Sequence, residues 1–397
     1  MSRSFEDARG LILDAVKRLP TETVPLLDAL GRALAVDITA PFDLPRFDNS
    51  AMDGFAVRSR DCLKPAVTLQ VSGYIPAGGR AEPAVATGCA VRIMTGGPIP
   101  PDCDAVVPFE ETEEKSTEVL IHGKVTARAH IRFRGEDIRE QELAMSTGCR
   151  LRPAEINMLA SFGHAEIPVY RRARVAILST GDELVELGHP LSTEVIVNSN
   201  SWSLAAAVRE LGAEPVMLGI ARDNHTSLRE KLAAGLQYDA LITSAGVSAG
   251  DRDFVREILT ELDVKQLFWK VDIKPGRPTA FGIKGNTPVF SLPGNPVSSM
   301  ITFDQFVRPA LLQMMGHSQT DKPLFMATLK EAIRKKAGRV QFMRVVISNE
   351  DGELFASSSG DQNTAIVCTM LRANGLAILP AERDSFAAGE RVPVQFI

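Results

Sequence analysis

The sequence of 397 residues contains no run of about 18 apolar residues, which is the length a helix needs to cross a bilayer. Its first residues, MSRSFEDARGLILDAV, carry acidic side chains and no long apolar core, so we expect no signal peptide. The formal net charge is −5, and the chain therefore offers no general basic field for nucleic acid. We expect a cytoplasmic protein that binds neither membranes nor nucleic acid.

Familiar patterns of metal, redox and phosphate sites are also missing. The cysteines number five, lie far apart and form no C-x-x-C pair, which favours free thiols in a reducing compartment. The six histidines show no H-E-x-x-H spacing, which argues against a zinc site. Neither a GK[ST] P-loop nor a G-x-G-x-x-G turn is present, so an anion would need another kind of loop.

Residues 171–320 alternate strand and helix signals, which predicts a doubly wound α/β domain with a mostly parallel sheet. In such sheets ligands bind beyond the carboxyl ends of the strands, where small-residue turns are expected to lie. The expected strands are ARVAILST, EPVMLGIA, the apolar run before residue 245, VKQLFWKVDI and TPVFSLPG. The expected helices are NSNSWSLAAAVRELG, HTSLREKLAAGL, the segment after residue 253, and NPVSSMITFDQFVRPALLQMMG.

The rest of the chain does not alternate strand and helix signals in this way. Residues 46–136 are rich in strand signals and in Pro and Gly turns, which predicts a β-rich domain. Residues 321–397 carry short strands, and VVIS and ELFA flank an N-E-D-G hairpin signal, which predicts a small β domain resembling a barrel. Residues 1–45 and 137–170 read as helical or connecting.

The turn in DALITSAGVSAGDRDF, residues 239–254, offers free backbone N–H groups before a helix-like pattern, an arrangement that favours an anion. Asp251 and Asp253 would repel a naked phosphate unless a cation lay between them. An anion held with a hard, oxygen-liganded metal such as Mg²⁺ fits both halves of the segment. The alternative is that the aspartates only cap a helix with exposed side chains.

Other turns repeat this mixture of acids, cations and free amides. SLPGNPVSSM places Asn295 as N-cap and Pro296 as the first helical residue. Each turn alone is also compatible with a simple cap or with solvated charges, whereas together they suit a highly anionic ligand held through a divalent metal. The remaining turns are STGDEL (179–184), VDIKPGRPTAFG (271–282), RFDNSAMDGFAV (46–57), VRIMTGGPIPPDCDAVVPFEE (91–111) and FRGEDI (133–138).

These segments resemble the MoeA family of molybdopterin molybdenumtransferases, which is related to the E domain of gephyrin. The resemblance runs from about residue 5 to the C-terminus and rests on eight motifs in the family's order. They are NSAMDGFAV, GYIPAGG, VRIMTGGPIPPDCDAVVPFEE, RGEDI, STGDEL, the 241–253 turn, FWKVDIKPGRPTAFG and LPGNPVSS. Ala245 stands where the family usually has glycine, Arg277 stands where lysine is common, and residues 359–375 match only loosely.

The resemblance implies an enzyme that takes adenylylated molybdopterin and molybdate and, with Mg²⁺ as cofactor, yields the molybdenum-bearing cofactor and AMP. It implies a homodimer with shared active sites, and an adenylyltransferase of the MogA type as a possible partner. It also implies an extended linker-like domain (1–45 and 137–170), a β-rich domain (46–136), a MogA-like α/β domain (171–320) and a C-terminal β domain (321–397). The rival functions are a molybdopterin adenylyltransferase and a catalytically silent, gephyrin-like scaffold.

The same resemblance implies a set of site residues. Chemically, Asp253 with Asp223 would hold Mg²⁺ against a diphosphate, and Lys270 and Lys274 would attract the molybdate dianion. The implied catalytic residues are Asp53, Thr95, Asp137, Glu183, Asp253, Lys270 and Lys274. The implied ligand-binding residues are Pro293, Pro296 and Arg344. The turn itself adds Gly246, Ser248 and Gly250, whose backbone amides would bind the phosphate, and the expected metal ligands are Asp223 and Asp253.

Overall fold

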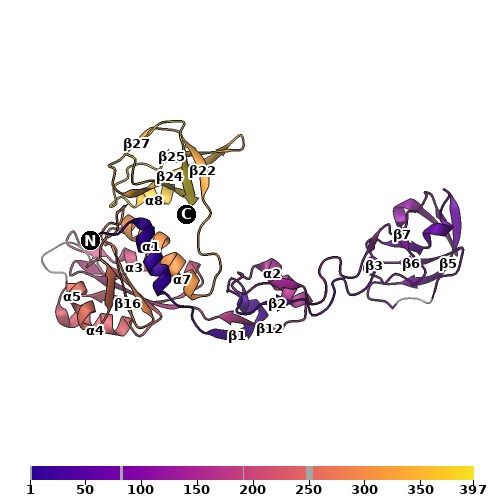
Figure 1. Cartoon of the computed structure of the whole chain (residues 1–397), viewed down its shortest axis with the longest axis horizontal. Coiled ribbons are helices and arrows are strands. Elements are labelled where there is room, and N and C mark those ends of the chain that lie inside the picture. Colours follow the sequence, from indigo (N-terminus) through magenta and orange to yellow (C-terminus); the bar gives the residue numbers. More distant parts are fainter. Residues whose placement is uncertain (1, 81–83, 191, 247–253) are drawn as a thin grey trace. The chain divides into compact units, whose positions relative to one another are not determined.

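The computed structural model describes residues 2–80, 84–190, 192–246 and 254–397, so that Ser248, Gly250 and Asp253 of the expected site lie outside the described residues. The chain divides into two compact units. The first comprises Met1–Val36, Thr147–Asn157 and Ala165–Ile397, and the second comprises Asp37–Ser146 and Met158–His164 (Figure 1). Among the described residues, no helix is both long and apolar enough to span a membrane.

The first unit contains the expected doubly wound sheet. Its strand order is β16-β13-β17-β21-β20-β18, with parallel pairing from β16 to β21 and antiparallel pairing from β21 to β18. The parallel core is confirmed, whereas β20 was not expected as a strand. The bounds are β13 (Arg174–Thr180), β16 (Glu214–Ala221), β17 (Ala240–Ser244), β18 (Lys265–Phe268), β20 (Ala280–Lys284) and β21 (Thr287–Leu292).

Both faces of this sheet are buried, because alternate residues of its strands point to opposite sides. In β13, Val175 and Ile177 join one core, while Ala176 and Leu178 join the other. The first core also receives α1 (Phe5–Ala15), α3 (Ser199–Glu210), α6 (Pro296–Thr302) and α7 (Arg308–Met314). The second core receives α4 (His225–Gly235) and α5 (Phe254–Glu261), which lie together in Figure 1.

The helices begin where their sequences provide caps. The Asn198 side chain accepts from the Ser201 N–H at the start of α3, and Asn224 accepts from the Ser227 N–H at the start of α4. Asn295 and Pro296 take the expected positions at the start of α6, although the Asn295 side chain makes no capping hydrogen bond. The long helix expected after residue 294 continues from α6 through a π-helical turn, η4 (Phe303–Val307), into α7.

The C-terminal strands of this unit close into a five-stranded barrel, which confirms the expected barrel-like domain. The β24–β25 hairpin turns at Asp351 and Gly352, which both have positive φ, as a two-residue loop between twisted strands requires. The barrel strands are β22 (Phe325–Leu329), β24 (Val340–Glu350), β25 (Glu353–Ser358), β26 (Gly375–Leu379) and β28 (Arg391–Phe396), with β23 (Ile333–Arg334), β27 (Ser385–Phe386) and α8 (Cys368–Arg372) beside them.

Two segments depart from the sequence-based expectations. The single strand expected in VKQLFWKVDI is two, because β18 stays in the α/β sheet while β19 (Ile273–Lys274) pairs with β24 of the barrel. The first helix, α1, is not part of a linker: its Ala8 and Ile12 lie in the α/β core, and the Phe5 ring lies 5.6 Å from that of Phe306 and 5.1 Å from that of Phe342. α1 packs here because its apolar side chains are buried in this core, and the expectation of a linker did not take these side chains into account.

The connecting segments of the first unit are mainly extended. β1 (Thr21–Pro25), which was expected to be helical or connecting, pairs antiparallel with β12 (Glu166–Tyr170). Short elements complete the unit: η1 (Leu26–Ala29) follows β1, and β14 (Leu184–Val185) pairs with β15 (Ile196–Val197). The boundary between the two units falls within α2 (Pro153–Ser161), between Asn157 and Met158.

The second unit is the expected β-rich domain. Its main sheet has the order β7-β4-β6-β5-β9-β8 and is apolar on both faces, since Phe55 and Ala56 of β4 belong to different cores. The strands are β4 (Gly54–Val57), β5 (Val67–Ile75), β6 (Cys89–Ile93), β7 (Ala105–Pro108), β8 (Thr112–Lys115) and β9 (Glu118–Ile121). Small elements flank them: β2 (Ile38–Thr39) with β11 (Leu143–Met145), β3 (Asn49–Ser50) with β10 (Ile131–Arg132), η2 (Ser59–Asp61) and η3 (Phe109–Glu111).

The turn after α7 predicts a specific stability effect. Gly316 has φ +81°, and a Cβ atom there would lie 2.0 Å from Cδ2 of Tyr170. Gly188 has φ +86° with no atom within 4 Å of its Cβ position, so it is a matched control for the backbone alone. We expect Gly188→Ala to cost about 1–2 kcal/mol from the left-handed backbone, and Gly316→Ala about 1–3 kcal/mol more from overpacking. Thermal unfolding followed by near-UV circular dichroism measures both, and equal losses would contradict the packing argument.

Candidate active site

A pocket of about 450 Å³ lies at the carboxyl ends of β13, β17 and β21. The turns that follow these three strands were expected to meet at this edge, and the structure confirms that they do. Because every residue of β17 is buried, polar groups of this strand become accessible only where it ends. The pocket is lined by Ser179, Glu183, Leu184, Ile196, Val197, Asn198, Ser199, Asn200, Ser244, Ala245, Gly246, Pro278, Pro293, Gly294, Asn295 and Pro296.

Two asparagines at the start of α3 tie these turns together. The Asn200 Nδ2 donates to Ser244 Oγ at 2.9 Å and to the Gly294 carbonyl at 2.7 Å. The Ser179 hydroxyl donates to Asn198 Oδ1 at 2.7 Å. These bonds hold the pocket in one shape before any ligand arrives.

The same asparagines keep buried polar atoms without a partner. Within the described residues, Asn198 Nδ2 and Asn200 Oδ1 are buried and make no hydrogen bond. An unmade hydrogen bond on a buried atom is costly, and both residues line the pocket, where a ligand could supply the missing partners. The sequence-based interpretation saw these residues only as part of a helix cap.

The turn after β17 adopts a left-handed backbone at two successive residues. Ala245 has φ +74° and Gly246 has φ +75°. A Cβ atom on Gly246 would lie 2.5 Å from Cγ2 of Val255 and 2.9 Å from Oγ1 of Thr180, so glycine is required there for space as well as for conformation. Ala245 takes the glycine-like conformation nonetheless, with its N–H donating to the Leu292 carbonyl at 3.1 Å.

An acidic pocket of about 460 Å³ adjoins the first one and shares Glu183, Ala245 and Gly246 with it. It is also lined by Asp182 and Asp223, and the Asp223 N–H donates to Asp182 Oδ1 at 3.1 Å. Burial raises the pKa of Asp223 above its ordinary value, and the negative charges of Asp182 and Glu183 raise it further. Among the described residues none of these carboxylates forms an ion pair, although the Arg222 guanidinium donates to the Asp182 carbonyl at 2.9 Å. Asp182 lines the pocket, whereas the expected site residues included only Glu183 from this turn.

This acidic pocket fits a divalent cation in donor chemistry. In the parts of the chain that the structure describes, no three His, Cys, Asp or Glu side chains already form a ligand set. Mg²⁺ in phosphate-binding sites commonly takes one or two carboxylates and completes its shell with phosphate oxygens and water. One or two of the carboxylates of Asp182, Glu183 and Asp223 would suffice for that use.

The two lysines of the site lie on the segment that passes from the α/β sheet to the barrel. Lys270 is half-buried and Lys274 is exposed, and neither side chain has an ion-pair partner among the described residues. The N-terminal segment holds this stretch in place, because the Arg3 N–H donates to the Lys270 carbonyl at 3.0 Å and the Asp272 N–H donates to the Arg3 carbonyl at 2.8 Å. The Ser2 hydroxyl adds a bond of 2.7 Å to the Asp272 carboxylate.

In the β-rich unit, the structure brings two expected site residues together from separate motifs. Asp53 Oδ1 accepts from the Thr95 N–H at 2.7 Å and from the Thr95 hydroxyl at 2.8 Å. These hydrogen bonds lower the pKa of Asp53, so its carboxylate is ionised at neutral pH. Asp137 is exposed on a different turn, where its N–H donates to the Leu44 carbonyl at 3.0 Å.

Pro293 and Pro296 line the main pocket, but Arg344 does not. Arg344 lies on β24 with 1% of its surface exposed, and its guanidinium donates to the carbonyls of Asp361 at 2.9 Å and Asn363 at 3.2 Å. Burial lowers the pKa of this arginine. In this structure Arg344 therefore orders the loop after β25, and its Nε and Nη1 atoms find no partner among the described residues.

Comparison with known proteins places the chain in a family. Its residues 3–163 match the MoeA N-terminal region (domain I and II), residues 176–313 match a probable molybdopterin binding domain, and residues 326–397 match the MoeA C-terminal region (domain IV). A molybdopterin molybdenumtransferase of Haemophilus influenzae is 37% identical to it, over 99% of this chain and 98% of the relative. The chain belongs to the MoeA family.

Further relatives agree with this assignment. Molybdopterin molybdenumtransferase 2 of Mycobacterium tuberculosis is 36% identical over 99% of each chain. The crystal structure of the molybdopterin biosynthesis moeA protein from Pyrococcus horikoshii OT3 superposes with a TM-score of 0.86, at 30% identity and with full coverage of both chains. The resemblance inferred from eight motifs is thereby confirmed, together with the multidomain α/β fold that it implied.

The left-handed Ala245 predicts a gain in stability on substitution. A non-glycine residue in this region costs of order 1–3 kcal/mol, so Ala245→Gly should stabilise this MoeA-family protein by about 1 kcal/mol despite the greater entropy of the unfolded chain. Ala206, exposed in the interior of α3, is the control, because glycine within a helix should cost about 1 kcal/mol. Denaturant unfolding with a probe on the α/β domain measures both variants. A loss of stability in Ala245→Gly equal to that in Ala206→Gly would contradict the strain.

Proposed function

We propose that this chain is a molybdopterin molybdenumtransferase, which transfers molybdenum from molybdate to adenylylated molybdopterin and releases AMP. The observation that carries the proposal is the pair of adjoining pockets at the carboxyl edge of the sheet, one preorganised by asparagines and one acidic. Membership of the MoeA family supports the same conclusion. The substrate would thus span the pocket held by the asparagines and an adjoining metal site.

The pterin and its phosphate would occupy the main pocket. The free Asn198 Nδ2 and Asn200 Oδ1 offer one donor and one acceptor, which suits a heterocycle with alternating amide-like groups. The Ala245–Gly246 turn brings the backbone close to the ligand, and backbone N–H groups beyond it, including those of Ser248 and Gly250, would bind phosphate oxygens. Pro293 and Pro296 would form apolar walls.

Asp223 and Asp253 would hold Mg²⁺, with Asp182 and Glu183 close to it. The bound ion would supply Lewis-acid stabilisation of the charge on the departing AMP. Asp223 shares its pocket with two other carboxylates, and a cation there would lower its raised pKa and keep it ionised. No protein nucleophile is required for this reaction.

Lys270 and Lys274 would bind molybdate. Because neither lysine is neutralised by an acid among the described residues, both can attract a dianion and stabilise charge as the phosphoanhydride breaks. Asp53, Thr95 and Asp137 would contribute from the β-rich unit, Asp53 as a carboxylate fixed by Thr95. We further propose a homodimer with shared sites, which a monomeric yet fully active protein in analytical ultracentrifugation would contradict.

The decisive assay supplies purified protein with adenylylated molybdopterin, molybdate and Mg²⁺ and follows AMP. We expect AMP to appear only when all three are present, and chelation of the metal to stop its release. A second reaction with molybdopterin and ATP tests for an adenylyltransferase. Adenylylation without molybdate, or tight substrate binding with no AMP under any condition, would overturn the proposal in favour of an adenylyltransferase or a silent scaffold.

Lys274 predicts a defect that depends on molybdate concentration. Lys274→Ala removes one charge-assisted contact, so we expect the molybdate concentration for half-maximal rate to rise roughly tenfold or more, with the rate largely restored at saturation. Lys265→Ala is the control, because Lys265 is an exposed lysine on the neighbouring β18. Initial rates of AMP release across a molybdate series measure the effect. A rate defect that is equal at every molybdate concentration would count against this role.

A further inference from the structure

A separate recess of about 200 Å³ lies at the amino-terminal edge of the doubly wound sheet, opposite the edge that holds the two pockets of the candidate active site. It is lined by Leu211 and Gly212, which precede β16, and by Arg172, which precedes β13. Parallel strands β13 and β16 both begin at this edge, so the recess is separated from the proposed active site by the length of the sheet. The proposed function makes no use of it.

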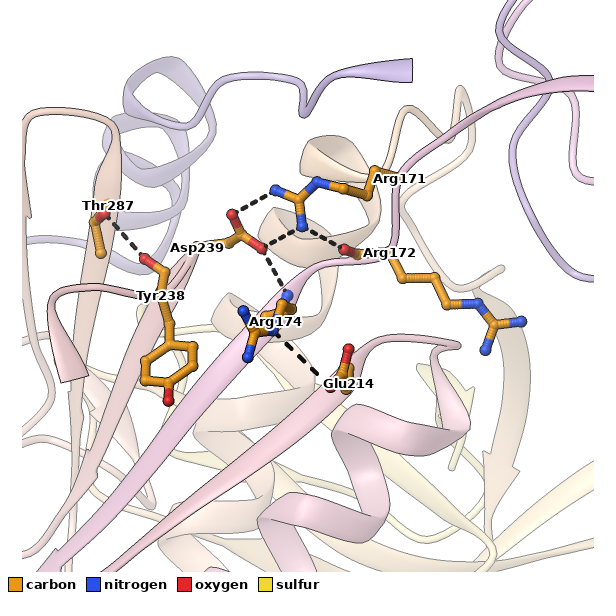
Figure 2. A network of polar contacts seen from close by, with 7 residues as sticks. All are labelled: Arg171, Arg172, Arg174, Glu214, Tyr238, Asp239 and Thr287. Atoms are coloured by element: carbon orange, nitrogen blue, oxygen red, sulfur yellow. Dashed lines mark hydrogen bonds and ion pairs between the residues drawn. The ribbon is translucent and has the colours of Figure 1, made fainter. Parts of the chain in front are cut away.

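The segment between β12 and β13 directs consecutive arginines to different surroundings. Figure 2 shows Arg171 pointing toward Asp239, while the Arg172 side chain points away from it. The Arg171 guanidinium donates to both Asp239 oxygens, at 2.9 and 2.6 Å, and Asp239 also accepts from the Arg174 N–H at 2.7 Å. Arg171 is therefore neutralised, and Arg172, which lines the recess, has no carboxylate partner among the described residues.

Two further arginines from distant parts of the chain complete the cluster. Arg150 and Arg209 line the recess and, like Arg172, form no ion pair in the described part of the chain. Arg32 also lines it but is bound to Glu22 and to the Tyr170 carbonyl. Because Glu210 is the single carboxylate among the lining residues, the unneutralised arginines leave an excess of positive charge.

A buried histidine lines the same recess, close to Arg150. His317 lines the recess with 8% of its surface exposed, and its ring makes no hydrogen bond to any described residue. Burial, together with the charges of Arg150 and Arg308, lowers the pKa of His317 to about 4. The ring is therefore neutral at pH 7 and can donate one hydrogen bond to a bound group.

We propose that Arg150, Arg172, Arg209 and His317 form a second anion site, which binds a tetrahedral oxyanion such as inorganic phosphate or the phosphate end of a small metabolite. Arg150, Arg172 and Arg209 are exposed residues from separate segments that line the recess, and their guanidinium groups would supply the forked donors that suit a tetrahedral oxyanion. The recess is large enough for a phosphate group and too small to enclose a nucleotide, whose remainder would lie outside. Glu210 lines the same recess, and its carboxylate would repel an anion that has no O–H or N–H group to donate to it.

The test uses the full chain without ligand and records the nuclear magnetic resonance signal of the His317 ring. The signal is assigned by its loss in the His317→Gln variant. Inorganic phosphate, sulfate and AMP are titrated at constant ionic strength. We expect saturable shifts of the His317 signal and a pKa of His317 above 4 when the anion is bound, since a nearby negative charge favours the charged ring. Equal affinity for phosphate and AMP would identify the phosphate group alone as the ligand, and tighter AMP binding would identify a metabolite.

Matched variants distinguish a local site from general screening of charge. Arg172→Gln and Arg209→Gln should each weaken the His317 response at least tenfold, whereas Arg60→Gln, an exposed arginine of the β-rich unit, should leave it unchanged. Lys274→Ala should also leave it unchanged, so phosphate binding at the proposed active site is not counted here. A His317 signal that never saturates, or one that falls equally in Arg60→Gln, would overturn the proposal without affecting the proposed function.

Discussion

The burial of both faces of the parallel strands is the constraint on which the rest of this protein depends. β13 and β17 bury every residue except Arg174, and their apolar side chains divide between two cores, so neither face is open to a ligand. Polar groups can therefore gather only where the strands begin or end. The candidate active site occupies one of these edges, and the arginine-lined recess occupies the other.

Each edge is shaped by segments that lie far from it in sequence. The N-terminal residues Ser2 and Arg3 bind the stretch that carries Lys270, and α1 then enters the core of the α/β domain. Phe5 contacts the π-helical turn through Phe306 and the barrel through Phe342, which joins the two parts of the unit in a single apolar core. A substitution at Ser2 or Arg3 would therefore alter the segment that carries the lysines proposed to bind molybdate.

The two edges of the doubly wound sheet carry charges of opposite sign. At the carboxyl edge, Asp182, Glu183 and Asp223 accumulate negative charge beside a left-handed turn, which is useful only with a cation and an anionic ligand together. At the amino-terminal edge, Arg171 is paired with Asp239, whereas Arg172 has no carboxylate partner among the described residues. The buried His317 stays neutral beside Arg150 and Arg308. Uncompensated charge of either sign costs stability, and it is concentrated here where a ligand could offset it.

The sequence by itself determined the elements and the family. Helical and strand periodicity located α3, α4, β13, β16 and the β24–β25 hairpin, because these segments are stabilised by their own caps, turns and apolar pattern. Only the tertiary structure decided how segments distant along the chain combine. Such contacts, which leave no local pattern in the sequence, decide the pairing of β19 with β24, the burial of Arg344 and the bond between Asp53 and Thr95. They also decide which buried amide atoms of Asn198 and Asn200 have no partner among the described residues. Local preferences fix an element's type, whereas burial and long-range hydrogen bonding fix which side chains meet.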